Sequence, residues 1–273
     1  STEEIEKSSI LNQKDFTRAK ETIKFIKDKK WNSALKSASK VKDREFRNLI
    51  TWMYLKTTRN GASFSEYKNF IEQNNNYPRI NRIRFLAESK IYLRNNSPTS
   101  IINWFDKYPP LGGMGKIKLA EAYLEKGQTD KVGELIKEGW ETATISKNDL
   151  GYYRAKFKKF IDSEDHIKRA DYLAWEKKYW DLKRMLKYLP KDQRALYNAR
   201  QILMSNSYGV DNAISKVPEY LKNDPGLEFD RLRWRNRRGR LEGSLEILYR
   251  NSIKTEEQMV RPDKWWEQRE SVV

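Results

Sequence analysis

The sequence predicts an all-α protein built as a superhelical array of stacked helical hairpins. Three observations support this class. Apolar residues recur at helical spacing along most of the chain, and no stretch alternates as a β-strand does. The 12 Gly and eight Pro of the 273 residues stand between these helical patterns. One predicted helix is apolar on two opposite faces, and such a helix needs neighbours of the same kind to cover it.

That helix lies in the segment from Asp224 to Arg250. Asp224 can cap it, and Pro225 suits its first position, where the missing N–H costs no hydrogen bond. Its two apolar faces carry Leu227 and Trp234 on one side and Phe229 and Leu232 on the other. Gly239 ends it. A second helix follows with one apolar face, made by Leu241, Leu245 and Leu248. The segment therefore predicts a helical hairpin between other hairpins.

The remaining helices follow from the same periodicity. Residues 1–14 are predicted to be a polar leader, and 15–273 a single α-superhelical domain. Local signals mark several helix starts: the Ser63–Glu66 capping box, Pro78, the pair Ser97–Pro98, and Pro262 before Trp265 and Trp266. Between them, apolar groups predict further helices around Ala19, Leu35, Ile50, Trp140, Phe157, Leu173, Met185 and Leu203.

A short repeated sequence supports a repeat architecture. Leu86-Ala87-Glu88 recurs as Leu119-Ala120-Glu121. The interval of about 30 residues is the length of one two-helix repeat in a solenoid. With the alternation of helices on either side, this repeated sequence favours a TPR-like α-solenoid.

Composition excludes several kinds of function. The chain has no Cys, so thiolate zinc sites and thiol nucleophiles are excluded, and its single His, His166, excludes multi-histidine metal sites. We expect His166 to be a structural or surface residue in a first helical turn capped by Ser163. The Gly-rich segment 112–116 lacks the spacing and the preceding strand of a phosphate loop. We therefore predict no metal and no cofactor. No apolar run approaches the ~20 residues that span a bilayer.

The net charge of +17 implies a polyanionic partner, such as nucleic acid, anionic lipid or an acidic polymer. The alternative is that lysines on outer helices are simply solvated. For nucleic acid, the helices show no repeated pair of polar residues of the kind that reads one base per repeat, so we expect nucleic acid not to be the partner.

Five segments resemble a known family in the order in which they occur. They are FSEYKNFIEQNNNYPRINRIRFLAE, KYPPLGGMGKIKLAEAYLEKG, DHIKRADYLAWEKKYWDLKRML, NDPGLEFDRLRWRNRRGRLEGSLEIL and RPDKWWEQRE. They are similar to the N-terminal superhelical region of soluble lytic murein transglycosylases of the alphaproteobacterial type. The resemblance runs from Phe64 to the end of the chain.

This resemblance implies a periplasmic protein that acts on peptidoglycan. In the family, the superhelix carries a C-terminal lysozyme-like domain whose Glu cleaves the glycan to a 1,6-anhydro product. The Glu270-Ser271 pair lacks the Gly-Leu-Met-Gln segment that follows the family's Glu-Ser motif. We therefore predict that this chain contains no catalytic residue and is truncated before the catalytic domain.

Candidate binding residues lie on the Arg-rich helix of the hairpin described above. Arg231, Arg235 and Arg238 share one face (i, i+4, i+7), where they could meet the carboxylates of stem peptides or of an attached domain. The alternative is pairing with acidic side chains of neighbouring repeats, such as Asp230, Glu242 and Glu246. Two further functions remain open: a free-standing helical scaffold that binds a protein, and a nucleic-acid-binding helical array.

Overall fold

The computed structural model describes residues 8–206, 208–239, 241–252, 254 and 256–272, with the backbone alone at 241, 242, 252, 256, 271 and 272. The described residues form sixteen α-helices and four short 3₁₀-helices, and no β-strand occurs among them. The predicted all-α class is therefore confirmed. The chain divides into two compact units, residues 1–122 and 123–273, which we describe separately.

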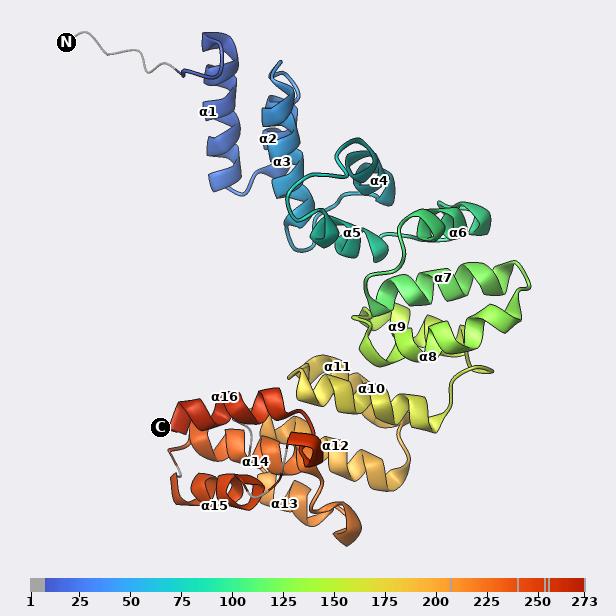
Figure 1. Cartoon of the computed structure of the whole chain (residues 1–273), viewed down its shortest axis with the longest axis vertical. Coiled ribbons are helices and arrows are strands. Elements are labelled where there is room, and N and C mark those ends of the chain that lie inside the picture. Colours follow the sequence, from blue (N-terminus) through green and yellow to red (C-terminus); the bar gives the residue numbers. More distant parts are fainter. Residues whose placement is uncertain (1–7, 207, 240, 253, 255, 273) are drawn as a thin grey trace, which may run out of the picture. The chain divides into compact units, whose positions relative to one another are not determined.

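The N-terminal unit holds the first seven helices, drawn in blue to green in Figure 1. Successive helices pack on one another: α1 on α2, α2 on α3, and α3 on both α4 and α5. This packing between sequence neighbours is compatible with an α-solenoid. The helices are α1 (Gln13–Lys27), α2 (Trp31–Ala38), α3 (Arg44–Lys56), α4 (Phe64–Gln73), α5 (Ile80–Glu88), α6 (Pro98–Lys107) and α7 (Gly113–Glu125), the last of which crosses the boundary of the unit.

Local capping places most of these helix starts where the sequence predicts them. Ser63 and Glu66 form the predicted capping box of α4, and Ser97 caps α6 with Pro98 at its first position. Helix α1 begins at Gln13, before the predicted end of the leader at 14, and residues 1–7 of that leader lie outside the described residues. The predicted start at Pro78 is wrong, because Arg79 adopts φ 55° and α5 begins only at Ile80.

A buried carboxylate joins α5 to the start of α7. Glu88 is 3% exposed, and its two oxygens accept hydrogen bonds from the backbone N–H groups of Leu111 (2.7 Å) and Gly112 (2.9 Å). Burial raises the pKa of the Glu88 carboxyl to about 7, although these two hydrogen bonds and the charge of Arg84 act in the opposite direction. The Gly-rich segment 112–116 thus leads into α7, and the side chain of Glu88, which lies on α5, caps the start of α7.

The C-terminal unit is organised around α14, as the sequence indicates. This helix contacts α10, α12, α15 and α16, so the prediction that it lies between neighbours is confirmed. Asp224 caps it by accepting a hydrogen bond from the N–H of Leu227 (3.0 Å), and Pro225 stands at its first position. The helices of this unit are α8 (Val132–Thr142), α9 (Lys147–Lys156), α10 (Ser163–Trp175), α11 (Tyr179–Met185), α12 (Lys191–Leu203), α13 (Val210–Ser215), α14 (Pro225–Arg237), α15 (Leu241–Ser252) and α16 (Pro262–Val272).

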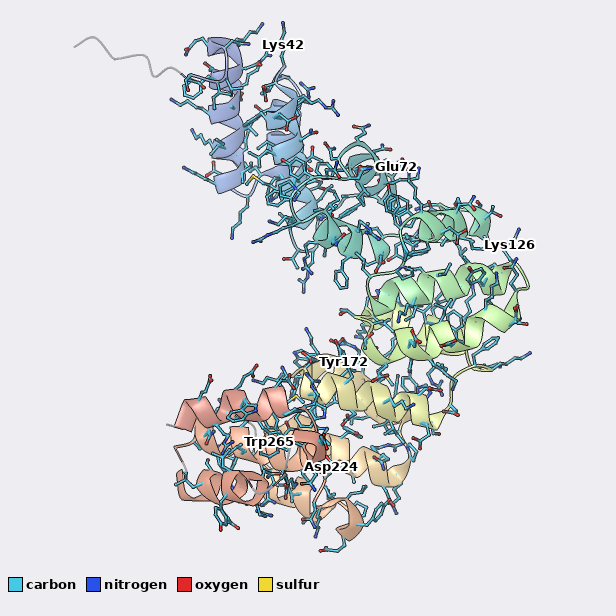
Figure 2. All side chains as sticks on the ribbon, in the orientation of Figure 1. Lys42, Glu72, Lys126, Tyr172, Asp224 and Trp265 are labelled. Carbon is cyan, nitrogen blue, oxygen red and sulfur yellow. The ribbon has the colours of Figure 1, made fainter. Side chains whose placement is uncertain are left out.

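Aromatic side chains form the centre of this unit. The rings of Trp175 and Phe229 lie 5.1 Å apart, and Trp265 meets the ring of Phe229 edge-on at 5.3 Å. Leu232 and Ile247 complete this buried cluster, which joins α10, α14, α15 and α16. Figure 2 labels Trp265 among the packed side chains of the unit. Trp265 is therefore a core residue, whereas the adjacent Trp266 is 49% exposed.

The inward face of α15 differs from the predicted one. Gly239 adopts φ 68° and ends α14 as expected, but Leu245 is 49% exposed, whereas Ile247 is 1% exposed. The buried residues of this helix include Ser244 and Asn251, whose amide donates a hydrogen bond to the carbonyl of Ile247 (2.9 Å). The predicted face of Leu241, Leu245 and Leu248 is thus wrong at Leu245, Leu248 packs on the core cluster, and the side chain of Leu241 lies outside the described residues.

Candidate functional site

The three arginines predicted to bind a ligand lie on α14 but have different surroundings. Arg235 donates from Nη1 to the carbonyl oxygen of Gly243 (3.0 Å), so it connects α14 to α15. Arg231 is half-buried and makes no hydrogen bond or ion pair with a described residue; burial lowers its pKa, and the nearby Arg235 and Arg250 lower it further. Arg238 is exposed, and its guanidinium lies 4.5 Å from the ring centroid of Trp234.

Asp230, one of the acidic residues predicted as an alternative partner of these three arginines, pairs with other arginines instead. Asp230 is 1% exposed and accepts hydrogen bonds from Arg200 Nε (2.7 Å) and from Arg233. Arg200 is fully buried and also donates from Nη1 to Asp171 (2.9 Å). Burial opposes the charge of Arg200, but Asp230 and Asp171 outweigh it and raise its pKa. Arg200, Asp230 and Arg233 are all buried, so the centre of this network is structural.

Arg238 lines a pocket of about 240 Å³ between α14 and the start of α13. Two aromatic residues contribute to it, the half-buried Trp234 and the fully exposed Tyr208. Asp211 and Asn212 add hydrogen-bonding groups from α13, and Gly209 and Val210 complete the lining. The sequence singled out Arg238 and Trp234 but not the residues of α13, because only the packing of α13 brings them to α14.

His166 and its neighbours are structural. Trp140 Nε1 donates a hydrogen bond to His166 Nδ1 (3.0 Å), and burial lowers the pKa of this imidazole. The predicted cap at Ser163 is wrong by one residue: Asp162 is the N-cap, and it forms a reciprocal capping box with Asp165. Among the described residues, no group of three or more His, Asp or Glu side chains is arranged to hold a metal ion.

Carboxyl groups with raised pKa values are candidates for catalytic acids, since a general acid must keep its proton near neutral pH. Two described carboxyls have this property, Glu88 and Asp224, and burial is the first cause in both. Both carboxylates accept hydrogen bonds from N–H groups at helix starts, and Glu88 is only 3% exposed. Their raised pKa values therefore come from the burial of two helix-capping carboxyls, and neither marks a catalytic cleft.

Comparison of the chain with family models, with curated proteins and with solved structures gave no match. The resemblance to the superhelical region of lytic transglycosylases therefore stays a prediction from the sequence. In the part of the chain that the structure describes, no helix has the length and apolar character needed to cross a bilayer.

Proposed function

We propose that this chain is a non-catalytic superhelical scaffold that binds peptidoglycan in the bacterial periplasm, as part of a lytic transglycosylase-like protein. Two properties of the sequence support the proposal: the five segments similar to that family and the net charge of +17. Peptidoglycan combines sugar rings with the carboxylates of its stem peptides. A cationic scaffold would hold such a polymer while a separate lysozyme-like domain cleaves it.

The pocket at Trp234 and Arg238 is the observation that carries this proposal. A sugar ring has C–H faces, which pack on the electron-rich faces of aromatic rings, and hydroxyl groups, which need hydrogen-bonding partners. Trp234 and Tyr208 offer aromatic faces, and Asp211 and Asn212 offer polar groups. Arg238 adds a cation whose guanidinium is already held against Trp234 at 4.5 Å from the ring centroid. The pocket therefore offers aromatic rings for the sugar, polar groups for its hydroxyls and a cation for a stem-peptide carboxylate.

Sedimentation with purified sacculi tests the proposal. We expect the chain to sediment with sacculi, and Arg238→Gln to weaken this binding about tenfold, because a charge-assisted contact is lost. Lys147→Gln removes the same charge from an exposed position on α9 and should leave binding unchanged. Equal loss in both variants would show that only net charge matters and would contradict a role for the pocket.

Two further measurements separate the competing functions. Incubation of sacculi with the chain alone should release no anhydro-muropeptides, and their release would overturn the non-catalytic assignment. RNA binding should fall steeply between ~50 and ~200 mM salt, as purely electrostatic binding does. RNA binding that survives this change, together with absent sedimentation on sacculi, would favour the nucleic-acid-binding array instead.

A further inference from the structure

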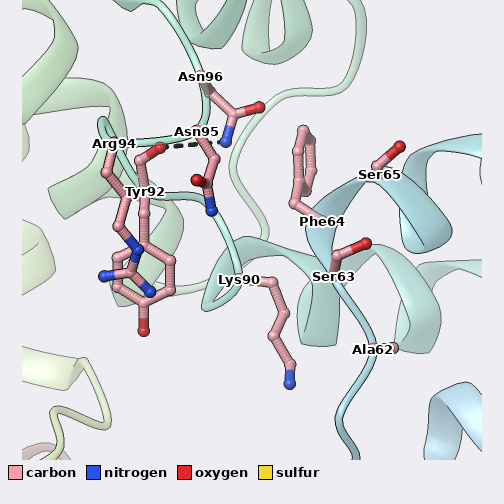
Figure 3. A pocket seen from close by; sticks show the side chains of 9 residues that line it. All are labelled: Ala62, Ser63, Phe64, Ser65, Lys90, Tyr92, Arg94, Asn95 and Asn96. Carbon is pink, nitrogen blue, oxygen red and sulfur yellow. Dashed lines mark hydrogen bonds between the residues drawn. The ribbon is translucent and has the colours of Figure 1, made fainter.

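A second pocket, of about 470 Å³, lies in the N-terminal unit and belongs to no predicted site. Figure 3 shows it between the start of α4 and the segment that joins α5 to α6. One wall carries small and aromatic residues, and the other carries cations and amides. The lining consists of Ala62, Ser63, Phe64, Ser65, Lys90, Tyr92, Arg94, Asn95 and Asn96.

The lining is positively charged. Lys90 and Arg94 are cations, and none of the nine lining residues is acidic. A third cation, Lys118, is buried next to the lining residue Tyr92. It is 1% exposed, and its Nζ lies 3.9 Å from the ring centroid of Tyr92. Glu66 lies outside the lining, and its carboxylate accepts hydrogen bonds from Ser63 in the capping box of α4. The pocket therefore favours an anion.

Arg94 is held in place without using its hydrogen-bond donors. Its guanidinium lies 4.2 Å from the ring centroid of Tyr92, and Figure 3 shows the two groups stacked. Arg94 is exposed and makes no hydrogen bond or ion pair with a described residue. A guanidinium presents five N–H donors in a planar fork that matches a carboxylate. Stacking thus orients this fork for a planar anion in advance.

The other polar groups complete this arrangement. Lys90 donates one hydrogen bond from Nζ to the carbonyl oxygen of Asn60 (2.7 Å), which fixes the ammonium and leaves two of its three protons for a ligand. The side-chain amide of Asn95 makes no hydrogen bond with a described residue, whereas that of Asn96 donates to the carbonyl of Tyr92 (3.1 Å). Two charged donors and one amide therefore line the same pocket.

The opposite wall combines two buried apolar residues with the exposed Ser63 and Ser65. Phe64 is 8% exposed, and its ring meets Trp104 edge-on at 5.2 Å between centroids. Ala62 beside it is 3% exposed. A ligand that fits both walls carries an anion next to a small apolar group. The free C-terminal end of a short peptide has this chemistry, with a planar carboxylate beside a small side chain, whereas an inorganic phosphate has no apolar part.

We infer that this pocket binds the free carboxylate end of a short peptide through Arg94, Lys90 and Asn95. The inference rests on the proposed function in one respect, because the stem peptides of peptidoglycan supply such ends. It adds a site in the N-terminal unit that is separate in sequence from the pocket at Trp234 and Arg238.

Titration with acetyl-Ala-Ala, followed by backbone amide NMR, tests the inference on the whole chain. We expect saturable shifts at the amides of residues 90–96, and none with the C-terminal carboxamide of the same peptide. Arg94→Gln should weaken binding tenfold or more, since an ion-paired hydrogen bond is lost. Lys36→Gln is the charge-matched control, because Lys36 is exposed on α2 and outside the lining. Equal shifts with the carboxamide, or equal weakening in the control, would overturn the inference.

Competition with inorganic phosphate tests whether the pocket binds phosphate rather than a carboxylate. Phosphate that binds at 90–96 when the peptide does not would overturn the assignment to a carboxylate. The outcomes also separate this inference from the proposed function. Sacculus binding without peptide binding refutes the pocket alone, whereas peptide binding without sacculus binding refutes the proposed function alone. Because Arg94 is exposed, its variant should keep the unfolding temperature of the parent chain.

Discussion

Replacing Gly226 with Ala tests whether the buried network around Arg200 stabilises the C-terminal unit. Gly226 is the second residue of α14, and a Cβ atom built there would lie 2.3 Å from Cζ and Nη1 of Arg200. The guanidinium cannot stay in place at that distance. It is fully buried, however, and it donates hydrogen bonds from Nε to the Asp230 carboxylate (2.7 Å) and from Nη1 to the Asp171 carboxylate (2.9 Å). The added methyl group must therefore displace the cation from its carboxylates or push α14 away from α12.

Two opposing effects set the expected magnitude. Breaking a buried ion pair costs about 3–5 kcal/mol, because a charge is left without its partner. Ala in place of a helical Gly contributes about 0.5–1 kcal/mol of stability, chiefly by restricting the unfolded chain. We therefore expect Gly226→Ala to lower the free energy of unfolding by roughly 2–4 kcal/mol. This loss is a large share of the ~5–15 kcal/mol that typical domains possess.

Hydrogen exchange is the suitable measurement, because a chain with two compact units need not unfold in one step. Amides of α12 and α14 should lose protection in Gly226→Ala, whereas those of α1 to α4 should keep it. Gly133→Ala and Gly151→Ala are matched controls, since both glycines lie in helices and no atom lies within 4 Å of an added Cβ. Each control should stabilise by about 0.5–1 kcal/mol. Unchanged protection of α12 and α14 in Gly226→Ala would refute the reasoning.

Three further predictions concern single residues. The folded Glu88 carboxyl has a pKa of about 7 against an ordinary 4.5. Its contribution to stability is therefore complete below pH 4.5 and is lost as pH rises through 7. Glu88→Gln should reduce the change of the unfolding temperature of the N-terminal unit with pH. For His166 the sign is opposite, because burial lowers its pKa from 6.5: acid below that value should break the hydrogen bond from Trp140, which the indole N–H resonance reports. Ile247→Ala should destabilise by about 2–5 kcal/mol in urea unfolding, and Leu245→Ala by less than ~0.5 kcal/mol; equal effects would contradict the orientation of α15.

The sequence predicts the helices well wherever a short segment contains its own start signal. Ser63 with Glu66, Ser97 with Pro98, and Asp224 with Pro225 each combine an N-cap with a second feature of the first turn, and all three mark helix starts in the structure. Such signals work because a cap satisfies backbone N–H groups within the same few residues. No distant contact is needed to decide them.

The errors arise where packing decides. Pro78 has the same local appearance as a first-turn proline, but Arg79 after it adopts φ 55°, which no helix allows. The spacing of leucines on α15 predicts that Leu245 is inward, yet the neighbours of that helix bury Ile247, Ser244 and Asn251 instead. Periodicity gives the width of an apolar face, but contacts with other helices fix which residues lie at its centre.

The arginines show why charge alone could not locate a binding site. Three arginines of α14 make structural contacts: Arg233 with Asp230 of the same helix, Arg235 with the carbonyl of Gly243, and Arg237 with the carbonyl of Leu203. A run of arginines in the sequence cannot separate these structural contacts from binding contacts. The carbonyls of Gly243 and Leu203 belong to α15 and α12, which only folding brings to α14.

Arg94 and Arg238 differ from those structural arginines in the same two ways. Both line pockets, and neither makes a side-chain hydrogen bond or ion pair with a described residue. Each is instead held by an aromatic ring, at 4.2 Å from the centroid of Tyr92 and 4.5 Å from that of Trp234. Stacking restricts a guanidinium without consuming its donors, so little further ordering is needed when an anion binds. We therefore expect Tyr92→Leu and Trp234→Leu to weaken ligand binding although no donor is removed, and unchanged affinity in both would show that stacking does not prepare these sites.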